Sequence, residues 1–155
     1  MASYENSIVI EAPLSDVYAY VNEPTTFPDW VHGMIDVHNV IGTGEGQQYE
    51  WTYKMVGMQF RGQSVAVNYV KDECAAYQSI GMIESIWTNF VEPHDGGTKL
   101  TVKVEYSIPA PVLGKLAEVL TLRRNMRGLN STLLNAKEVL EGAERASVPD
   151  LRPMG

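Results

Sequence analysis

Cysteine is almost absent from this sequence, since Cys74 is the single one among 155 residues. A disulfide needs two cysteines, and a cysteine-based zinc site needs more than one thiolate. The three histidines, His32, His38 and His94, do not have the spacing of a zinc-binding motif. We therefore expect a protein with no disulfide, no metal ion and no cofactor.

Positive charge is also scarce, because 12 lysines and arginines stand against 19 aspartates and glutamates, giving a formal net charge of −7. A general nucleic-acid binder needs a basic surface that displaces counterions from phosphates. No uncharged apolar stretch approaches the roughly 18 residues of a transmembrane helix, and no secretory signal opens the chain. These absences predict a cytoplasmic protein with no nucleic-acid partner and no integral membrane association.

Phenylalanine is rare, with 3 residues, whereas tyrosine occurs 8 times. A tyrosine buried in a closed core needs a hydrogen-bond partner for its hydroxyl, while one that faces a cavity can meet water or a ligand. The aromatic composition thus favours an interior that is partly polar.

The spacing of the apolar residues predicts the order of the secondary structure. Residues 4–12 are short, β-branched and partly alternating, as in a strand, and short helical segments follow over 14–21 and 25–32. Over residues 34–109 the period is two, and turn signals divide this part into about six strands. Over residues 111–141 apolar side chains recur every three or four positions, which predicts one amphipathic helix of about 30 residues.

This order predicts an α+β fold in which a seven-stranded antiparallel sheet curves around a long C-terminal helix. A strongly curved sheet cannot close tightly on such a helix along its whole length, and small ligands occupy cavities of that kind. We expect a single domain over residues 1–142 and a flexible tail over residues 143–155, where glycine and proline alternate with scattered charges.

Three segments of the chain carry a family resemblance. They are Ile8-Val9-Ile10-Glu11-Ala12-Pro13 with Asp16-Val17-Tyr18, then Phe27-Pro28-Asp29-Trp30, then Gly96-Gly97-Thr98-Lys99-Leu100-Thr101 with Leu134-Asn135-Ala136-Lys137-Glu138-Val139-Leu140-Glu141. Over about residues 3–142 the chain resembles the SRPBCC superfamily, which has the helix-grip fold of START lipid-transfer domains and birch-pollen-type allergens. The resemblance is nearest to the bacterial polyketide cyclase/dehydrase-like proteins. It implies the fold described above, but these packing and turn residues carry no catalytic signature.

The candidate ligand-binding residues are mainly those that alternation places on the inward faces of the strands. The aromatic candidates either fill an ordinary core or line a cavity, and the excess of tyrosine favours the cavity. Arg61 shares strand parity with Tyr69, so it would point inward, unless Gly57 and Gly62 shift the register and send it to solvent. The full set is Trp30, Tyr49, Trp51, Tyr53, Arg61, Trp87, Asn89, Tyr106 and Met126.

The first functional hypothesis is binding of a small hydrophobic or amphiphilic ligand, such as a lipid, polyketide or aromatic compound, between sheet and helix. The resemblance implies a second, a cyclase, aromatase or dehydratase whose tyrosine and arginine act on a reactive chain. The third is a non-catalytic domain that binds a partner through a sheet edge or the basic cluster Arg123, Arg124 and Arg127. Exposed sheet edges also allow a homodimer.

Overall fold

The computed structural model of the chain describes residues 2–55, 57–81, 84–107 and 122–147, with side chains through most of these ranges. It begins with β1 (Ala2–Ile10), α1 (Leu14–Val21), the short 3₁₀ helix η1 (Pro24–Thr26) and α2 (Phe27–Trp30). Six strands and a helix follow: β2 (Met34–Ile41), β3 (Gln48–Met55), β4 (Met58–Val70), β5 (Cys74–Gly81), β6 (Glu84–His94), β7 (Gly97–Ser107) and α4 (Leu122–Ser147). This order confirms the predicted α+β fold. The part of the predicted long helix before residue 122 lies outside the described residues.

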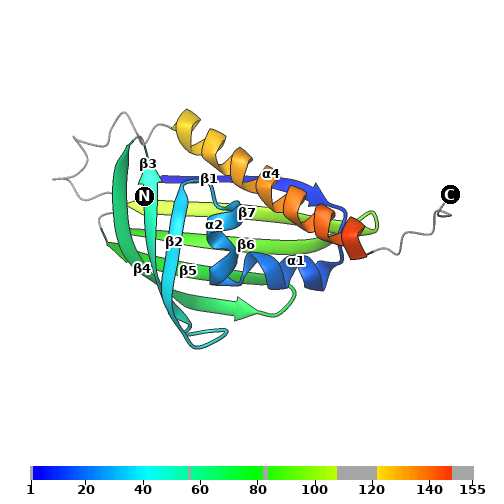
Figure 1. The fold of residues 1–155 in the computed structure, drawn as a ribbon, viewed down its shortest axis with the longest axis horizontal. Helices are drawn as coiled ribbons and strands as arrows, with labels where there is room; N and C mark the ends of the chain where they lie inside the picture. The colour runs from blue at the N-terminus through cyan, green and yellow to red at the C-terminus, as the bar shows by residue number, and fades with distance from the viewer. Residues whose placement is uncertain (1, 56, 82–83, 108–121, 148–155) are drawn as a thin grey trace, which may run out of the picture.

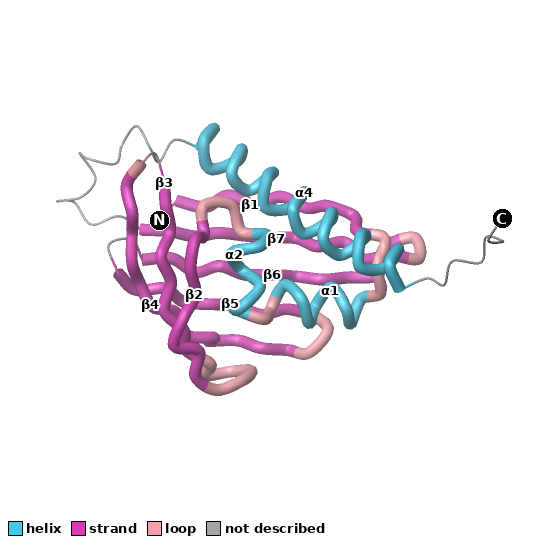
Figure 2. Tube along the Cα trace, in the orientation of Figure 1, coloured by secondary structure: helices cyan, strands magenta, loops and turns pink. Residues whose placement is uncertain are grey.

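All neighbouring strands are antiparallel, in the order β1-β7-β6-β5-β4-β3-β2. The first strand therefore crosses to the far edge of the sheet, beside the last one, and β2 forms the other edge. Figure 1 shows that α1, α2 and α4 lie on the same face of the sheet, with α4 running diagonally over β1 and β7. Figure 2 shows β2, β3 and β4 curling toward the helices beside α2.

The helices pack on the sheet through apolar stripes, as their sequence spacing predicts. In α1 the buried side chains are Val17 and Tyr18 and, one helical turn later, Val21. In α4 the buried apolar side chains are Leu129, Leu133, Ala136 and Leu140, which step by three or four residues. Within the described residues, no helix is long and apolar enough to cross a membrane.

Two predicted boundaries differ from those of the structure. The first strand ends at Ile10, because the backbone turns there and the Ala12 N–H donates to the Ile10 carbonyl at 2.9 Å. The predicted tail begins inside α4, which continues through Gly142 to Ser147. A single glycine costs a helix only about 1 kcal/mol, and the alanine, glutamate and arginine that follow it favour helix. Residues 148–155 lie outside the described residues.

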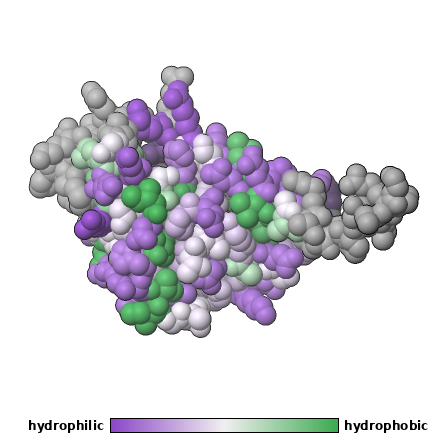
Figure 3. Space-filling view, viewed as in Figure 1, coloured by the Kyte–Doolittle hydropathy of each residue, from purple (hydrophilic) through white to green (hydrophobic). Residues whose placement is uncertain are grey.

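The edge strand β2 carries apolar side chains on the molecular surface. Ile35 and Ile41 are 48% and 65% exposed. Figure 3 shows apolar side chains gathered over this edge on the face that carries the helices, where most of the other side chains are polar. Edge strands with exposed apolar residues can pair with another chain, and the homodimer stays a prediction.

Candidate functional site

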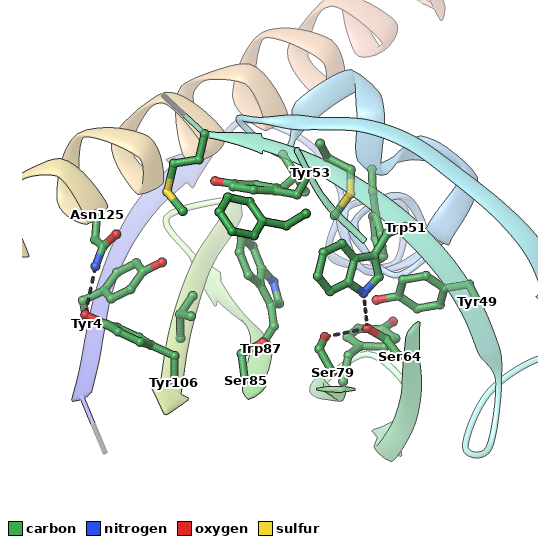
Figure 4. A pocket seen from close by; sticks show the side chains of 17 residues that line it. Tyr4, Tyr49, Trp51, Tyr53, Ser64, Ser79, Ser85, Trp87, Tyr106 and Asn125 are labelled. Atoms are coloured by element: carbon green, nitrogen blue, oxygen red, sulfur yellow. Dashed lines mark hydrogen bonds between the residues drawn. The ribbon is translucent and has the colours of Figure 1, made fainter. Parts of the chain in front are cut away.

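A cavity of about 160 Å³ lies between the concave face of the sheet and the helices; we call it the aromatic cavity. Its walls come from β1 to β7, α2 and α4, and most of its lining side chains are aromatic or apolar (Figure 4). The lining residues are Tyr4, Phe27, Val31, Met34, Tyr49, Trp51, Tyr53, Met55, Phe60, Ser64, Tyr77, Ser79, Ser85, Trp87, Val104, Tyr106 and Asn125.

One end of the aromatic cavity is fixed by hydrogen bonds that cross β3, β4 and β5. The indole N–H of Trp51 donates to Ser64 Oγ at 2.9 Å, and the hydroxyls of Ser64 and Ser79 are 2.5 Å apart. Ser64 and Ser79 are direct partners in the antiparallel register. These bonds hold the Trp51 ring against the neighbouring strands and satisfy two buried hydroxyls.

The other end of the aromatic cavity lies against α4. The Asn125 amide donates to the Tyr106 hydroxyl at 3.0 Å, and the rings of Tyr4 and Tyr106 meet edge to face with centroids 6.0 Å apart. Figure 4 shows these three side chains together at one end, opposite Trp51, with Trp87 between the two ends. A polar amide and phenol hydroxyls thus border one end of an otherwise apolar space.

A buried polar network positions the floor of the aromatic cavity. Trp87 Nε1 donates to Asn89 Oδ1 at 2.8 Å, and the Asn89 amide donates to Asn22 Oδ1 at 3.0 Å. The Tyr77 hydroxyl donates to the same Asn22 oxygen at 3.1 Å. Asn22 is the C-terminal cap of α1, so the network joins this helix to β5 and β6 and fixes the Trp87 ring.

Four tyrosines that line the aromatic cavity have phenol groups that stay neutral. Burial in an apolar environment raises the pKa of Tyr4, Tyr49, Tyr53 and Tyr77 above the ordinary value. No aspartate, glutamate, lysine, arginine or histidine is among the described residues that line it. The cavity can therefore stack on flat rings and donate hydrogen bonds to a ligand carbonyl or hydroxyl.

A second cavity of about 130 Å³ adjoins the first and is more polar; we call it the basic mouth. The two share Tyr4, Val31, Tyr53, Met55, Trp87 and Asn125 in their walls. The basic mouth adds Gly128, Leu129 and Thr132 of α4 and three residues of basic type, His32, Lys54 and Arg124.

The structure brings together five of the predicted site residues, since Tyr49, Trp51, Tyr53, Trp87 and Tyr106 all line the aromatic cavity. The other polar and helical candidates lie nearby. Asn89 is buried beneath the cavity in the polar network, and Trp30 is 1% exposed and packs edge to face on Trp87. Met126 is half-buried. These three are not among the described residues that line the cavity.

The inward orientation predicted for Arg61 is wrong. Arg61 is exposed, whereas its neighbours Phe60 and Ser64 are buried and line the cavity. The register of β4 against β5 shifts between Ala66 and Asn68, a β-bulge that inserts one residue. Strict alternation counted back from the inward-facing Tyr69 ignores this extra residue. It therefore assigns Arg61, which precedes the bulge, to the wrong face of the strand.

Sequence reasoning missed several lining residues, among them Tyr4, Ser64, Ser79 and Asn125. Asn125 lies four residues before Leu129 on the apolar stripe of α4, so its helical spacing was a usable signal. Ser64 and Ser79 gave no such signal in the sequence, because a serine in an alternating strand is equally compatible with either face. Tyr4 opens the predicted first strand, but only the pairing of β1 with β7 places it beside Tyr106.

Metal ligands are not clustered in the part of the chain that the structure describes: no group of three or more His, Cys, Asp or Glu side chains there could hold an ion. His38 and His94 instead lie at the surface next to acidic side chains, with His38 Nδ1 2.6 Å from Asp36 Oδ2.

Comparison with protein families gives a match over most of the chain. Residues 1–141 fit the model of the family described as "Polyketide cyclase / dehydrase and lipid transport". No curated protein sequence matches the chain significantly.

Solved structures with the same fold include proteins of quite different description. The protein TTHA0849 from Thermus thermophilus is 16% identical, with a TM-score of 0.78 over 92% of this chain and 99% of that one. The Zhui aromatase/cyclase from Streptomyces sp. R1128 is 14% identical, with a TM-score of 0.70 over 92% and 97%. The di-domain ARO/CYC StfQ from the steffimycin biosynthetic pathway is 20% identical, with a TM-score of 0.73 over 94% and 52%. At these identities the likeness is one of fold.

Proposed function

The chain belongs to the polyketide cyclase/dehydrase and lipid transport family, and from this premise we propose that it binds one small, flat aromatic molecule in the aromatic cavity. The observation that carries the proposal is the lining, in which Trp51, Trp87 and the tyrosines surround about 160 Å³ of space. Aromatic rings pack well against one another in edge-to-face and offset geometries, which favours a ring-shaped ligand.

The volume of the aromatic cavity limits the size of this ligand. Pockets for drug-sized molecules measure about 300–1,000 Å³, whereas an apolar cavity of about 150 Å³ is known to hold one benzene. A space of about 160 Å³ therefore suits a body of one or two fused rings better than a whole polyketide or a long acyl chain.

Polar groups at the two ends of the cavity would orient the ligand. The Tyr4 hydroxyl stays protonated because burial raises its pKa, so it can donate to a ligand carbonyl. The Asn125 amide and the hydroxyls of Ser64 and Ser79 offer both donors and acceptors. A ligand with a carbonyl or hydroxyl on its ring thus matches the lining better than a pure hydrocarbon.

Isothermal titration of the protein with naphthamide, a neutral two-ring amide, tests the proposal. Ser85 faces the aromatic cavity on β6, and Ser85→Phe would fill part of it. The matched control is Thr88→Phe, because residue 88 has the opposite strand parity and faces the outer side of the sheet. We expect wild type and Thr88→Phe to bind naphthamide and Ser85→Phe to lose binding at least tenfold. Equal affinities for the two variants would contradict the proposal.

A second candidate function is cyclisation or dehydration of a reactive polyketide-type chain. It is favoured by the neutral Tyr4 hydroxyl in the cavity and by the shared fold with the Zhui aromatase/cyclase. A phenol that donates a hydrogen bond to a ketone stabilises the oxyanion that forms when carbon attacks it. Incubation with a linear polyketone, followed by mass spectrometry, tests the idea: a product lighter by one water that vanishes in Tyr4→Phe supports it.

A further inference from the structure

Side chains that carry a hydroxyl form one row across the sheet side of the aromatic cavity; we call it the hydroxyl row. In the strand register each member is the direct partner of the next: Tyr49 on β3, Ser64 on β4, Ser79 on β5, Ser85 on β6 and Tyr106 on β7. All of them line the cavity, and Figure 4 shows the three serines next to one another between the two tyrosines. Because neighbouring strands lie about 4.8 Å apart, the row places one hydroxyl group on each strand.

Part of the hydroxyl row is engaged within the protein. Ser64 Oγ accepts from the Trp51 indole N–H at 2.9 Å and lies 2.5 Å from Ser79 Oγ. These three groups bring three protons and share two hydrogen bonds, so one hydroxyl proton is left over. Tyr49 lies beside Ser64, and its neutral hydroxyl adds a proton of its own, so it does not lower the number left over. In the cooperative head-to-tail chain, Trp51 donates to Ser64 and Ser64 to Ser79, which leaves the Ser79 proton for another acceptor.

Ser85 continues the row beyond Ser79. Its hydroxyl makes no hydrogen bond with any other described residue. Side chains that are direct cross-strand partners have Cβ atoms about 4.5–5.5 Å apart. One oxygen atom fits between two hydroxyls at that separation, within hydrogen-bond distance of both. The space between Ser79 and Ser85 therefore suits a single oxygen that accepts from each of them.

The other tryptophan of the cavity belongs to a network that ends inside the protein. Trp87 Nε1 donates to Asn89 Oδ1 at 2.8 Å, and the Asn89 amide donates to the Val21 carbonyl at 3.1 Å. That network ends on a backbone carbonyl of α1. The chain that starts at Trp51 ends instead at Ser79, on the cavity wall. Its last acceptor must therefore come from whatever fills the cavity.

We infer that Ser79 and Ser85 form a two-donor site for a carbonyl oxygen of the ligand, which makes the ligand an aromatic ketone of one or two rings. The inference rests on the proposed function, because the aromatic cavity must hold the rings of the same molecule. Ser85 and Trp87 lie two residues apart on the same face of β6, so a carbonyl bound at Ser85 places the attached ring beside the indole. A hydrocarbon group in place of the carbonyl would leave both hydroxyl protons without an acceptor, which weakens binding.

Two probes of nearly equal shape test the inference: acetonaphthone, a naphthyl methyl ketone, and isopropenylnaphthalene, in which a CH₂ group replaces the carbonyl oxygen. In calorimetric titration we expect the full chain to bind the ketone roughly tenfold more tightly, because two hydroxyls donate to it. Ser85→Ala should lower the ketone affinity roughly three- to tenfold and leave the hydrocarbon affinity unchanged. Ser79→Ala should change the ketone affinity in the same direction.

Infrared spectroscopy of acetonaphthone labelled with ¹³C at the carbonyl gives a readout that a purely structural role of Ser85 would not move. Hydrogen bonds weaken the C=O bond and lower its stretching frequency. We expect the bound ketone to absorb at a lower frequency than it does in an apolar solvent. In Ser85→Ala the frequency should move part of the way back.

The control variant is Thr88→Val, which removes a hydroxyl from the outer face of the same strand. Thermal melting of each variant confirms that it is folded. The carbonyl site is overturned, and the proposed function left intact, if naphthamide binds while the wild type does not prefer the ketone, or if Thr88→Val loses as much ketone affinity as Ser85→Ala. A ketone preference that survives in both serine variants would likewise assign the carbonyl to another donor. If neither naphthamide nor the two probes bind, the proposed function is overturned, and the carbonyl site with it.

Discussion

The indole of Trp51 occupies the space that a side chain at Gly62 would need. A Cβ on Gly62 would come within 2.4 Å of the Trp51 ring and 2.8 Å of the Ile80 carbonyl oxygen. Trp51 and Gly62 are direct partners in the register of β3 and β4. The absence of a side chain at residue 62 is therefore what allows a tryptophan to border the cavity at this point.

Replacing Gly62 with alanine would displace the Trp51 ring. We expect Gly62→Ala to lower the free energy of unfolding by about 1–3 kcal/mol, as overpacking does, and to weaken naphthamide binding. Urea denaturation and calorimetric titration measure the two effects. The comparison variant is Gly128→Ala, whose methyl would meet the His32 ring at an ordinary contact distance of 3.5 Å. A helical alanine there should stabilise the protein by up to about 1 kcal/mol, so similar losses in both variants would contradict the packing argument.

The hydroxyl of Ser64 is expected to contribute more to stability than that of Ser85, although both line the aromatic cavity. Ser64 accepts from the Trp51 indole and bonds to Ser79, and Ser64→Ala would leave the indole N–H without its acceptor. We expect a loss of about 1–2 kcal/mol for Ser64→Ala and roughly 0.5 kcal/mol or less for Ser85→Ala. Equal midpoints in urea would show that the hydrogen-bond chain is not stabilising.

Arg61 should be without effect on the ligand. It is exposed on the outer side of β4, away from both cavities. We expect Arg61→Ala to bind naphthamide with wild-type affinity in calorimetric titration. A loss comparable to that of Ser85→Phe would mean that Arg61 reaches the ligand and that its outward orientation is not maintained in solution.

The order of the elements could be predicted from the sequence because it depends on local periodicity. The alternation around Tyr49, Trp51 and Tyr53 and the helical spacing of Leu129, Leu133 and Ala136 are visible without knowing the fold. The five aromatic residues whose inward orientation was predicted correctly lie on strands in which inward and outward side chains alternate without interruption around them.

The rest of the site depends on information that local spacing does not contain. Arg61 was misplaced because a bulge is a property of two paired strands, and its position follows from the register of β4 with β5. The basic mouth was missed because His32, Lys54 and Arg124 come from three distant segments. The curvature of the whole sheet determines which inward-facing residues border the cavity.

Alkaline pH should destabilise the protein through its buried tyrosines. Burial raises the pKa of Tyr49 and Tyr77 in the folded chain, while the unfolded chain releases these protons near the ordinary tyrosine value of about 10. Between these two values the unfolded chain holds fewer protons, so the free energy of unfolding is unaffected below pH of about 10 and falls above it.

Urea denaturation below and above pH of about 10 measures this loss in the free energy of unfolding. The variant Tyr49→Phe should show a smaller loss, because phenylalanine at residue 49 has no proton to release. The tyrosinate absorbance of the folded protein gives an independent reading. If the folded chain shows its full tyrosinate signal near pH of about 10, then these hydroxyls are open to solvent and the raised pKa values are wrong.

The bulge in β4 also determines how this chain can change length. Upstream of it Phe60 and Ser64 serve the cavity, and downstream Tyr69 packs edge to face on Tyr18 of α1, so one strand contributes to two different parts of the interior. Deleting the single residue Val67 would remove the bulge and leave a regular strand in which Ser64, Ala66 and Tyr69 all keep the inward face. Loss of one residue is therefore expected to be tolerated at the bulge, whereas loss of one residue between Phe60 and Ser64 would turn one of these two side chains to the outer face.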